Sequence, residues 1–313
     1  MKNIFFISLY IIILMISVSC NQSVKKLDET PTRGDIKISV DDSYRLLIDT
    51  EIYTFESFYK NAKIRAEYKP ENDIFSDFFK DSVRLIITSR KLTNAEEDGL
   101  KSGNYIAKTT KVAYDAIAFI INNENSDTLL KYNSIKEIFE GKISKWSQID
   151  NKSNLNNINV VFDNNKSSNA RYIREKFELN KFPSNCYSVN SNEDVISYVE
   201  KNKNALGIIS VNWISDKHDS LSIDFLKRIK VVAISSELDT NGSGYYYRPY
   251  QGYIAQNSYP FIREVYMISR ETFIGLGSGF INFVAGEKGQ RIILKSGLVP
   301  ATMPIRLIQF GKQ

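Results

Sequence analysis

The sequence predicts an α/β fold of about two domains, with two extended runs that could link them. Three observations lead to this prediction. Short apolar strands alternate with polar loops and amphipathic helices, the order expected of a parallel sheet. Two extended runs, residues 112–122 and 261–268, are long enough to cross between lobes. The chain has 313 residues, 42% of them hydrophobic, which is enough for a large core and suggests about two domains.

The N-terminus predicts export. Lys2 is followed by a short apolar core that ends in small residues before Cys20. A transmembrane anchor is the alternative, but the apolar run is short for one. The pattern resembles a bacterial lipoprotein lipobox, which implies that residues 1–20 are a signal peptide and that Cys20 carries the lipid. Residues 21–33 lack apolar periodicity and predict a flexible tether between the membrane and the fold.

Charge and reactive residues narrow the function classes. The net charge of +5, with both signs interspersed, fits an anionic ligand or a membrane surface but is too diffuse to predict a nucleic-acid partner. The single histidine, His218, lies in a polar segment and is expected on the surface. With one histidine and two cysteines, the sequence predicts no metal site, no cofactor and no Ser–His triad. If Cys20 is lipidated, Cys186 is unpaired and is expected to be half-buried rather than a nucleophile.

The first third of the chain predicts alternating strands and helices. Strands are expected at 36–40, 64–68 and 83–87, and helices at 44–59, at 73–79 and from the capping box at 93–96. Ser43 is the expected N-cap of the helix at 44–59, because its hydroxyl can accept from the first free amides.

The segment 159–177 is the most informative. It predicts a buried strand, a polar loop and then a helix whose N-cap is Ser167 or Ser168. The first turn of such a helix offers unpaired N–H groups and a positive dipole end to an anion. Arg171 and Arg174 oppose that dipole by roughly 0.3–1 kcal/mol each, so a negative partner is expected nearby. An ordinary cap with solvated arginines is the alternative.

The rest of the chain supplies further elements. Helices are expected within 135–142, where Gly141 stops the helix, and at 191–201, 275–285 and 287–296, with strands at 205–211 and 229–234. Residues 242–248 contain three tyrosines and predict a loop whose rings pack over a lobe edge, with stacking on a sugar or base as the alternative. The sequence contains no internal repeat, Walker loop or Rossmann glycine fingerprint.

Three strand ends carry hydroxyl-rich loops. They are Asp42-Ser43, Thr88-Ser89-Arg90 and Ser167-Ser168-Asn169. In open α/β sheets, ligands bind outside the carboxyl ends of strands, near the point where the strand order switches. We therefore expect the three loops to line one cleft.

Seven stretches carry motifs of a single family. The most specific are I-F-E-G-K-I-S-K-W at 138–146 and the G-Q and S-G-L-V-P elements within 280–300. The others lie at 83–92, 113–123, 167–171, 205–211 and 259–268. Together they resemble the phosphate-type solute-binding proteins of bacterial ABC importers, in the order of that family, over most of residues 34–304.

The resemblance implies the class II periplasmic-binding-protein fold, in which two lobes close like a hinge on an oxyanion. Hydroxyl and backbone N–H groups would hold the anion without a full counter-charge. The candidate ligand-binding residues are Asp42, Ser43, Thr88, Ser89, Arg90, Asp115, Ser167, Ser168, Asn169 and Arg171.

Two departures from the family pattern bear on selectivity. The family's S-G-T cradle is S-S-N here, at 167–169. In well-known phosphate binders a carboxylate accepts the phosphate's proton and so excludes sulfate, because a buried unmatched group is costly. Ser89 stands at the matching position, which leaves Asp41, Asp42 and Asp115 as the candidates for that role.

The expected organisation follows from the resemblance. It comprises a signal peptide (1–20), a tether (21–33), lobe I (34–116 and 250–313) and lobe II (117–249). The leading hypothesis is a monomeric, non-enzymatic receptor, lipid-anchored on the periplasmic side of the cell envelope, that captures phosphate or a related oxyanion for an ABC permease. A sensor or scaffold lipoprotein that lost or changed this specificity is the alternative, favoured by the altered cradle. A hydrolase would need a base, and the Asp–Ser pairs lack a usable histidine.

Overall fold

A computed structural model describes residues 29–239 and 244–304. Its strands are β1 (Gly34–Asp41), β2 (Ala62–Lys69), β3 (Leu85–Thr88), β4 (Lys108–Asn122), β5 (Leu129–Leu130), β6 (Asn159–Phe162), β7 (Cys186–Ser188), β8 (Ala205–Ser210), β9 (Ile229–Val231), β10 (Ala233–Ser235), β11 (Tyr246–Tyr247), β12 (Ile262–Ser269) and β13 (Val299–Pro300). Its α-helices are α2 (Arg45–Phe58), α3 (Glu71–Phe79), α4 (Asn94–Ser102), α5 (Tyr132–Phe139), α6 (Ser168–Lys176), α7 (Asn192–Lys201), α8 (Ser220–Arg228), α9 (Gln251–Ala255), α10 (Leu276–Ala285) and α11 (Glu287–Lys295). Short 3-10 helices are η1 (Asp42–Tyr44), η2 (Trp146–Gln148) and η3 (Val211–Trp213).

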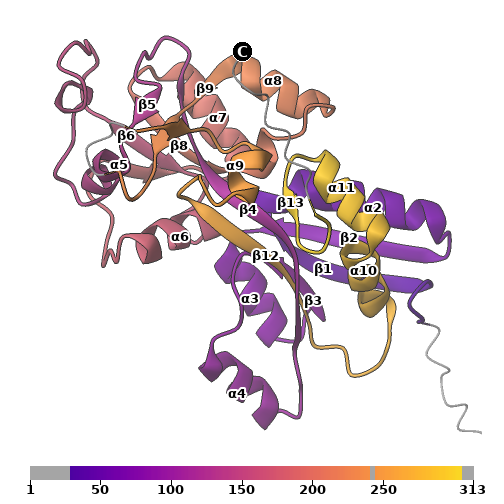
Figure 1. The fold of residues 1–313 in the computed structure, drawn as a ribbon. Coiled ribbons are helices and arrows are strands. Elements are labelled where there is room, and N and C mark those ends of the chain that lie inside the picture. The colour runs from indigo at the N-terminus through magenta and orange to yellow at the C-terminus, as the bar shows by residue number, and fades with distance from the viewer. Residues whose placement is uncertain (1–28, 240–243, 305–313) are drawn as a thin grey trace, which may run out of the picture.

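Two long strands, β4 and β12, join the two halves of the molecule (Figure 1). One sheet runs through both halves in the order β2-β1-β3-β12-β4-β8-β6-β7, and β9 and β13 also pair with β4. A smaller sheet has the order β11-β10-β5. The two predicted crossovers are thus neighbouring antiparallel strands in the middle of the large sheet.

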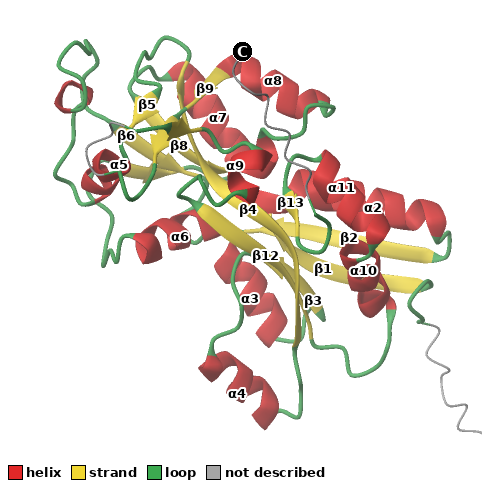
Figure 2. Cartoon of the chain, in the orientation of Figure 1, coloured by secondary structure: helices red, strands yellow, loops and turns green. Residues whose placement is uncertain are grey.

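Lobe I, the half around β1, β2 and β3, has helices on both faces of its sheet (Figure 2). Strand β1 pairs in parallel with both β2 and β3. Leu85 and Ile87 of β3 belong to the main core, which includes Phe55 of α2, whereas Ile86 belongs to a second core with Phe78 of α3. This division follows from the pleat of the strand, because successive side chains point to opposite faces.

Lobe II, the half around β6 and β8, repeats the parallel pairing, since β6 lies between β7 and β8. Every residue of β8 is buried, as expected of a strand covered on both faces. Glycine at position 207 allows α7 to pack directly on this strand. A Cβ there would lie 2.6 Å from Val199 and 2.8 Å from Val195.

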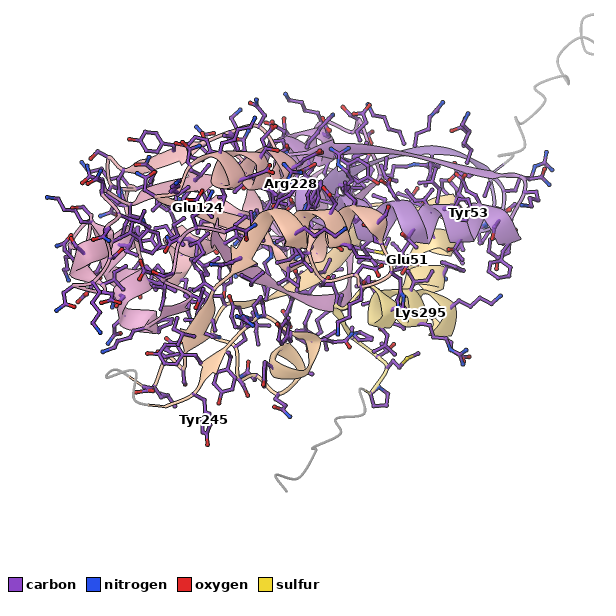
Figure 3. All side chains as sticks on the ribbon, turned by 90° about the horizontal axis from the view of Figure 1, so that it is seen from above. Glu51, Tyr53, Glu124, Arg228, Tyr245 and Lys295 are labelled. Atoms are coloured by element: carbon purple, nitrogen blue, oxygen red, sulfur yellow. The ribbon has the colours of Figure 1, made fainter. Side chains whose placement is uncertain are left out.

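Several local predictions need correction. Ser43 does not cap the helix that follows β1, because it lies inside η1 and its own amide donates to Asp41 Oδ1. The strand predicted at 229–234 is two strands, β9 and β10, which pair with different neighbours. The predicted tyrosine loop contains strand β11. Tyr247 packs edge-on against Tyr253 with ring centroids 5.0 Å apart, but Tyr245 is 78% exposed and extends from the surface (Figure 3).

Residues 29–33, which the sequence assigns to the tether, lie against lobe I. Glu29 forms an ion pair with Arg84 at 2.7 Å. Pro31 approaches α10 so closely that a Cβ at Gly279 would lie 1.8 Å from its carbonyl oxygen. This part of the predicted tether is therefore packed against the fold rather than flexible.

The remaining predictions concern exposure, export and lobe boundaries. His218 is exposed and Cys186 is half-buried, as predicted. Burial raises the pKa of the Cys186 thiol to about 12. The signal peptide, Cys20 and residues 21–28 lie outside the described residues. None of the described helices is long and apolar enough to cross a membrane. The lobe boundaries at 116/117 and 249/250 stay predictions.

Candidate functional site

The three predicted loops meet between the lobes. Ser43 Oγ, in η1 of lobe I, lies 3.2 Å from Ser168 Oγ, in α6 of lobe II, although the two residues are 125 positions apart. Thr88 and Ser89, at the end of β3, reach the same region, because Arg171 Nη2 of α6 donates to Ser89 Oγ at 2.7 Å. The convergence expected from the strand ends is therefore present in the structure, as a closed and buried contact region between the lobes that we call the cleft.

The start of α6 presents free donors to this cleft. Ser167 is the N-cap, and its hydroxyl accepts from Ala170 N (3.2 Å) while it donates to Asp163 Oδ1 (2.6 Å). Ser168 and Asn169 are fully buried. Their amides belong to the first helical turn, where no carbonyl within the helix can accept them. The Ser167 hydroxyl thus holds the loop, and the next two residues offer N–H groups.

A buried ion pair, which we call the hinge pair, lies at the base of the cleft. Asp115 of β4 and Arg263 of β12 are opposite each other in the strand register, and Arg263 Nε donates to Asp115 Oδ2 at 2.7 Å. Their side chains are 0% and 1% exposed. Arg263 Nη1 also donates to Ser168 Oγ at 3.0 Å, and Ser210 Oγ donates to Asp115 Oδ2 at 3.0 Å. The hinge pair thus connects the crossovers to the start of α6.

A second ion pair, the rim pair, bridges the lobes. Glu71, the first residue of α3, is fully buried and accepts from Arg171 Nε of α6. Glu71 Oε1 also accepts from Thr88 Oγ1 (2.8 Å) and Ser89 Oγ (3.1 Å). Burial raises the pKa of Glu71, but the charge of Arg171 and the hydrogen bonds from Arg171 and Thr88 outweigh it, so the pKa lies below its usual value. The negative partner expected near Arg171 is therefore a carboxylate of the protein itself.

Asn192, at the start of α7, links three polar groups of the cleft. Its Nδ2 donates to Asp42 Oδ2 and Asp163 Oδ2, both at 3.2 Å, and its Oδ1 accepts from Asn169 Nδ2 at 3.1 Å. Asp42 is otherwise paired with Arg45, whose Nη2 lies 2.7 Å from its Oδ1. This network fixes the loop of lobe I against two helix starts of lobe II.

Unpartnered polar atoms gather in this cleft. Twelve buried side-chain nitrogen and oxygen atoms of the described residues lack a hydrogen-bond partner, and six of them lie here. They belong to Asp41 (Oδ2), Tyr44 (Oη), Asp115 (Oδ1), Asn169 (Oδ1), Asn212 (Oδ1) and Arg263 (Nη2). Since buried polar groups are almost always paired, these six atoms are the groups that a polar ligand or an ordered water would satisfy. The described residues contain no group of three or more His, Cys, Asp or Glu that could hold a metal ion.

Two acids of the cleft are poised to carry protons. Burial raises the pKa of Asp41 to about 6, with the charge of Glu71 adding to the rise and Arg263 opposing it. Burial also raises the pKa of Asp163 to about 7, although the hydrogen bond from Ser167 favours the ionised form. Perturbed pKa values of this kind are typical of functional sites.

The predicted candidates fall into two groups. The cleft brings together Asp42, Ser43, Thr88, Ser89, Asp115, Ser168, Asn169 and Arg171, with Ser167 directly behind them. Arg90 is placed differently, since its guanidinium binds Glu96 at 2.7 Å and stacks 3.6 Å from the ring centre of Phe75.

Glu71, Asn192 and Arg263 were not predicted. Arg263 had a usable signal, because a charged residue in an apolar run that crosses the core must find a partner, and Asp115 lies in the other crossover. Glu71 and Asn192 stand at ordinary helix starts, and only the packing of the lobes reveals their role.

A family model described as a PBP superfamily domain matches residues 28–288. The phosphate-binding protein PstS of Staphylococcus aureus is 28% identical over 238 residues, which cover 74% of this chain and 68% of that protein.

Solved structures share the fold. A putative phosphate ABC transporter substrate-binding protein from Clostridium perfringens, with bound phosphate, superposes with a TM-score of 0.72 at 22% identity, covering 86% of this chain and 100% of the other. An ABC-type phosphate transport receptor from Vibrio cholerae gives 0.63 at 21% identity, with 86% and 100% covered. At such identities the likeness establishes the architecture, and the predicted two-lobed α/β fold is confirmed.

Proposed function

This chain belongs to the PBP superfamily, and on that premise we propose that it is a substrate-binding protein that captures phosphate between its lobes and delivers it to an ABC permease. The relative from S. aureus is named a phosphate-binding protein, and the neighbour from C. perfringens was solved with bound phosphate. The protein acts as a receptor in this proposal, without a catalytic step.

One observation carries the proposal, namely the chemistry around Ser168. The hydroxyls of Ser43 and Ser168, the first-turn amides of α6 and the free Nη2 of Arg263 form a buried set of donors that meet from both lobes. Donors of this kind suit an oxyanion, because they supply hydrogen bonds and a positive dipole end in a buried site. The hinge pair adds a guanidinium whose charge is already balanced by Asp115, so the anion would be held mainly by hydrogen bonds.

We assign the acceptor of the phosphate's proton to Asp41. Its Oδ2 is buried and has no hydrogen-bond partner among the residues that the structure describes, whereas Asp42 and Asp115 each have an arginine at 2.7 Å. A protonated phosphate can donate to Asp41. Sulfate carries no such proton at neutral pH, so two anionic oxygens would face each other in a buried site.

The location follows from the N-terminal sequence. A signal peptide of residues 1–20 with a lipid on Cys20 would hold the receptor at the membrane on the outer side, as a monomer within reach of its permease. Labelling with a radioactive fatty acid, lost in Cys20→Ala, tests the anchor.

A sensor or scaffold lipoprotein is the second candidate. It is favoured by the rim pair, because Glu71 already occupies the hydroxyls of Thr88 and Ser89 and the guanidinium of Arg171. Such a protein would keep the lobes together without an external anion.

The test is calorimetric titration of phosphate into the full chain, with sulfate and molybdate as competitors. The wild type is expected to bind phosphate and ignore sulfate. Ser168→Trp is expected to abolish binding, because the indole fills the place where Ser43, Ser168 and Arg263 meet.

Ser102→Trp is the control, since Ser102 is exposed at the end of α4. Figure 1 shows α4 at the outer end of lobe I, away from α6. This variant is expected to bind phosphate as the wild type does. If the wild type gives neither heat nor thermal stabilisation with any of the three anions, the receptor proposal fails and the sensor candidate replaces it.

A further inference from the structure

The contacts of Glu71 are those expected of a bound anion. Its two carboxylate oxygens take two hydroxyl donors, from Thr88 and Ser89, and a guanidinium, from Arg171. These three donors are among the residues that the sequence assigned to the ligand. Carboxylate and phosphate oxygens are interchangeable partners for arginine, since both accept its planar pair of N–H groups.

Glu71 also makes a contact that depends on how the two lobes are positioned. It is on α3 of lobe I, while Arg171 is on α6 of lobe II, 100 residues further along the chain. The start of α3 touches the other lobe at two more points. Asn72 N donates to Lys166 O at 3.3 Å, and Lys166 Nζ lies 3.5 Å from Asp73 Oδ1. Opening of the lobes would separate Glu71 from Arg171 but leave it with Thr88 and Ser89.

We propose that the Glu71 carboxylate is an internal competitor of the anion, which must be displaced from Ser89 and Arg171 before the ligand can use these donors. This inference rests on the proposed function, and it makes Glu71 a residue that sets the affinity for the anion. Each donor proton serves one acceptor at a time, so the apparent affinity for the anion is the intrinsic affinity multiplied by the fraction of molecules in which Glu71 has released the donors.

A purely structural ion pair predicts the opposite behaviour. If Glu71 only neutralises and positions Arg171, its removal leaves the guanidinium of Arg171 without a fixed position, and phosphate binds more weakly. If Glu71 competes, its neutral isostere releases both donors and one positive charge, and phosphate binds more tightly. The sign of the change therefore separates the two roles.

The experiment compares phosphate titrations of the wild type, Glu71→Gln and Asp73→Asn, each as the full chain. Glu71→Gln is expected to lower the dissociation constant for phosphate by about tenfold or more, because residue 71 then holds the donors in a smaller fraction of the molecules. Asp73→Asn is the matched control from the same helix start. Its carboxylate is half-exposed and touches none of the donors, so a change of no more than about threefold is expected. Equal or weaker binding by Glu71→Gln overturns the inference.

A second variant keeps the inference testable if the wild type binds no phosphate or Glu71→Gln does not fold. In Glu71→Ala the donors have no internal acceptor, and formate is small enough to take the place of the missing carboxylate. Titrated formate is expected to raise the melting temperature of Glu71→Ala and not that of the wild type or Asp73→Asn. Absence of that stabilisation overturns the inference, whereas absence of phosphate binding alone overturns only the proposed function.

Discussion

The hinge pair and the rim pair are both arginine–carboxylate contacts in one cleft, yet they differ in how the chain makes them. Asp115 and Arg263 are register partners on adjacent strands, so the pair exists whenever the sheet exists. Glu71 and Arg171 stand on helices of opposite lobes, so the pair exists only while the lobes touch.

The difference shows how one protein can combine a fixed and a releasable charge pair. A pair inside the sheet contributes to the free energy of unfolding, because neither partner can reach water without unfolding. A pair between lobes contributes to the equilibrium between open and closed states, because opening hydrates both partners. Mutations at the two pairs should therefore appear in different measurements.

The largest expected effect is at the hinge pair. Arg263→Met leaves the buried Asp115 without its counter-charge and should lower the free energy of unfolding by about 3–5 kcal/mol, measured by urea denaturation. Arg171→Met at the rim should lower it by about 1 kcal/mol or less, because the lobes can open and let water reach Glu71.

The double variant Arg263→Met with Asp115→Asn provides the control. Replacing both members of a buried pair is often neutral, so most of the lost stability should return. Phosphate binding should be lost in the single and the double variant alike, since both lack the guanidinium beside Ser168. Comparable losses from Arg263→Met and Arg171→Met would erase the distinction between the two pairs.

A third buried acid extends the comparison, because no arginine among the described residues forms an ion pair with it. Glu51 lies on α2, beside the C-terminal helices (Figure 3), and neither of its oxygens has a partner among the described residues. Burial raises its pKa to about 9 from 4.5. The folded state therefore holds this proton where the unfolded state has released it, and stability falls as the pH rises from about 4.5 to about 9.

Glu51→Gln should remove that pH dependence. The variant keeps the size of the side chain and takes up no proton on folding, so at pH 8 it should be more stable than the wild type by several kcal/mol, about 1.4 kcal/mol for each pH unit above 4.5. The gain should shrink toward pH 5, because the unfolded-state carboxyl, with a pKa near 4.5, begins to hold its proton as well. Thermal melts of the two proteins from pH 5 to 8 give the comparison, and parallel profiles would contradict it.

The sequence predicted the parts of the site that depend on local structure. The Ser167 cap of α6, the strand end at Thr88 and the long crossovers all follow from short-range patterns, because caps and strands leave a local signature. The Ser43 cap was wrong because Asp41, two residues before it, offers a better-placed acceptor for the free amide.

The partners of these residues could not be predicted in the same way. Glu71 looks like any acid in the first turn of a helix, where the dipole alone would favour it. Only the closure of lobe I on lobe II places it against Arg171, and that contact spans 100 positions. The local partner of Arg90 could not be predicted either, because Glu96, three residues beyond Thr93 in the capping box, binds its guanidinium.

The smallest expected effect tests whether the two ends of the cleft serve different occupants. Ser168 contacts Ser43 and Arg263, at the end of the cleft where we propose that the anion binds. Ser168→Ala should therefore weaken phosphate binding by about tenfold, the range expected for a hydrogen bond to a charged group. In the proposal, the Ser89 hydroxyl donates either to Glu71 or to the anion. Ser89→Ala therefore weakens the hold of Glu71 on the site and the binding of the anion at the same time. Its net effect in the same titration should stay within about threefold. A loss at Ser89 as large as that at Ser168 would mean that Glu71 does not hold this hydroxyl in competition with the anion.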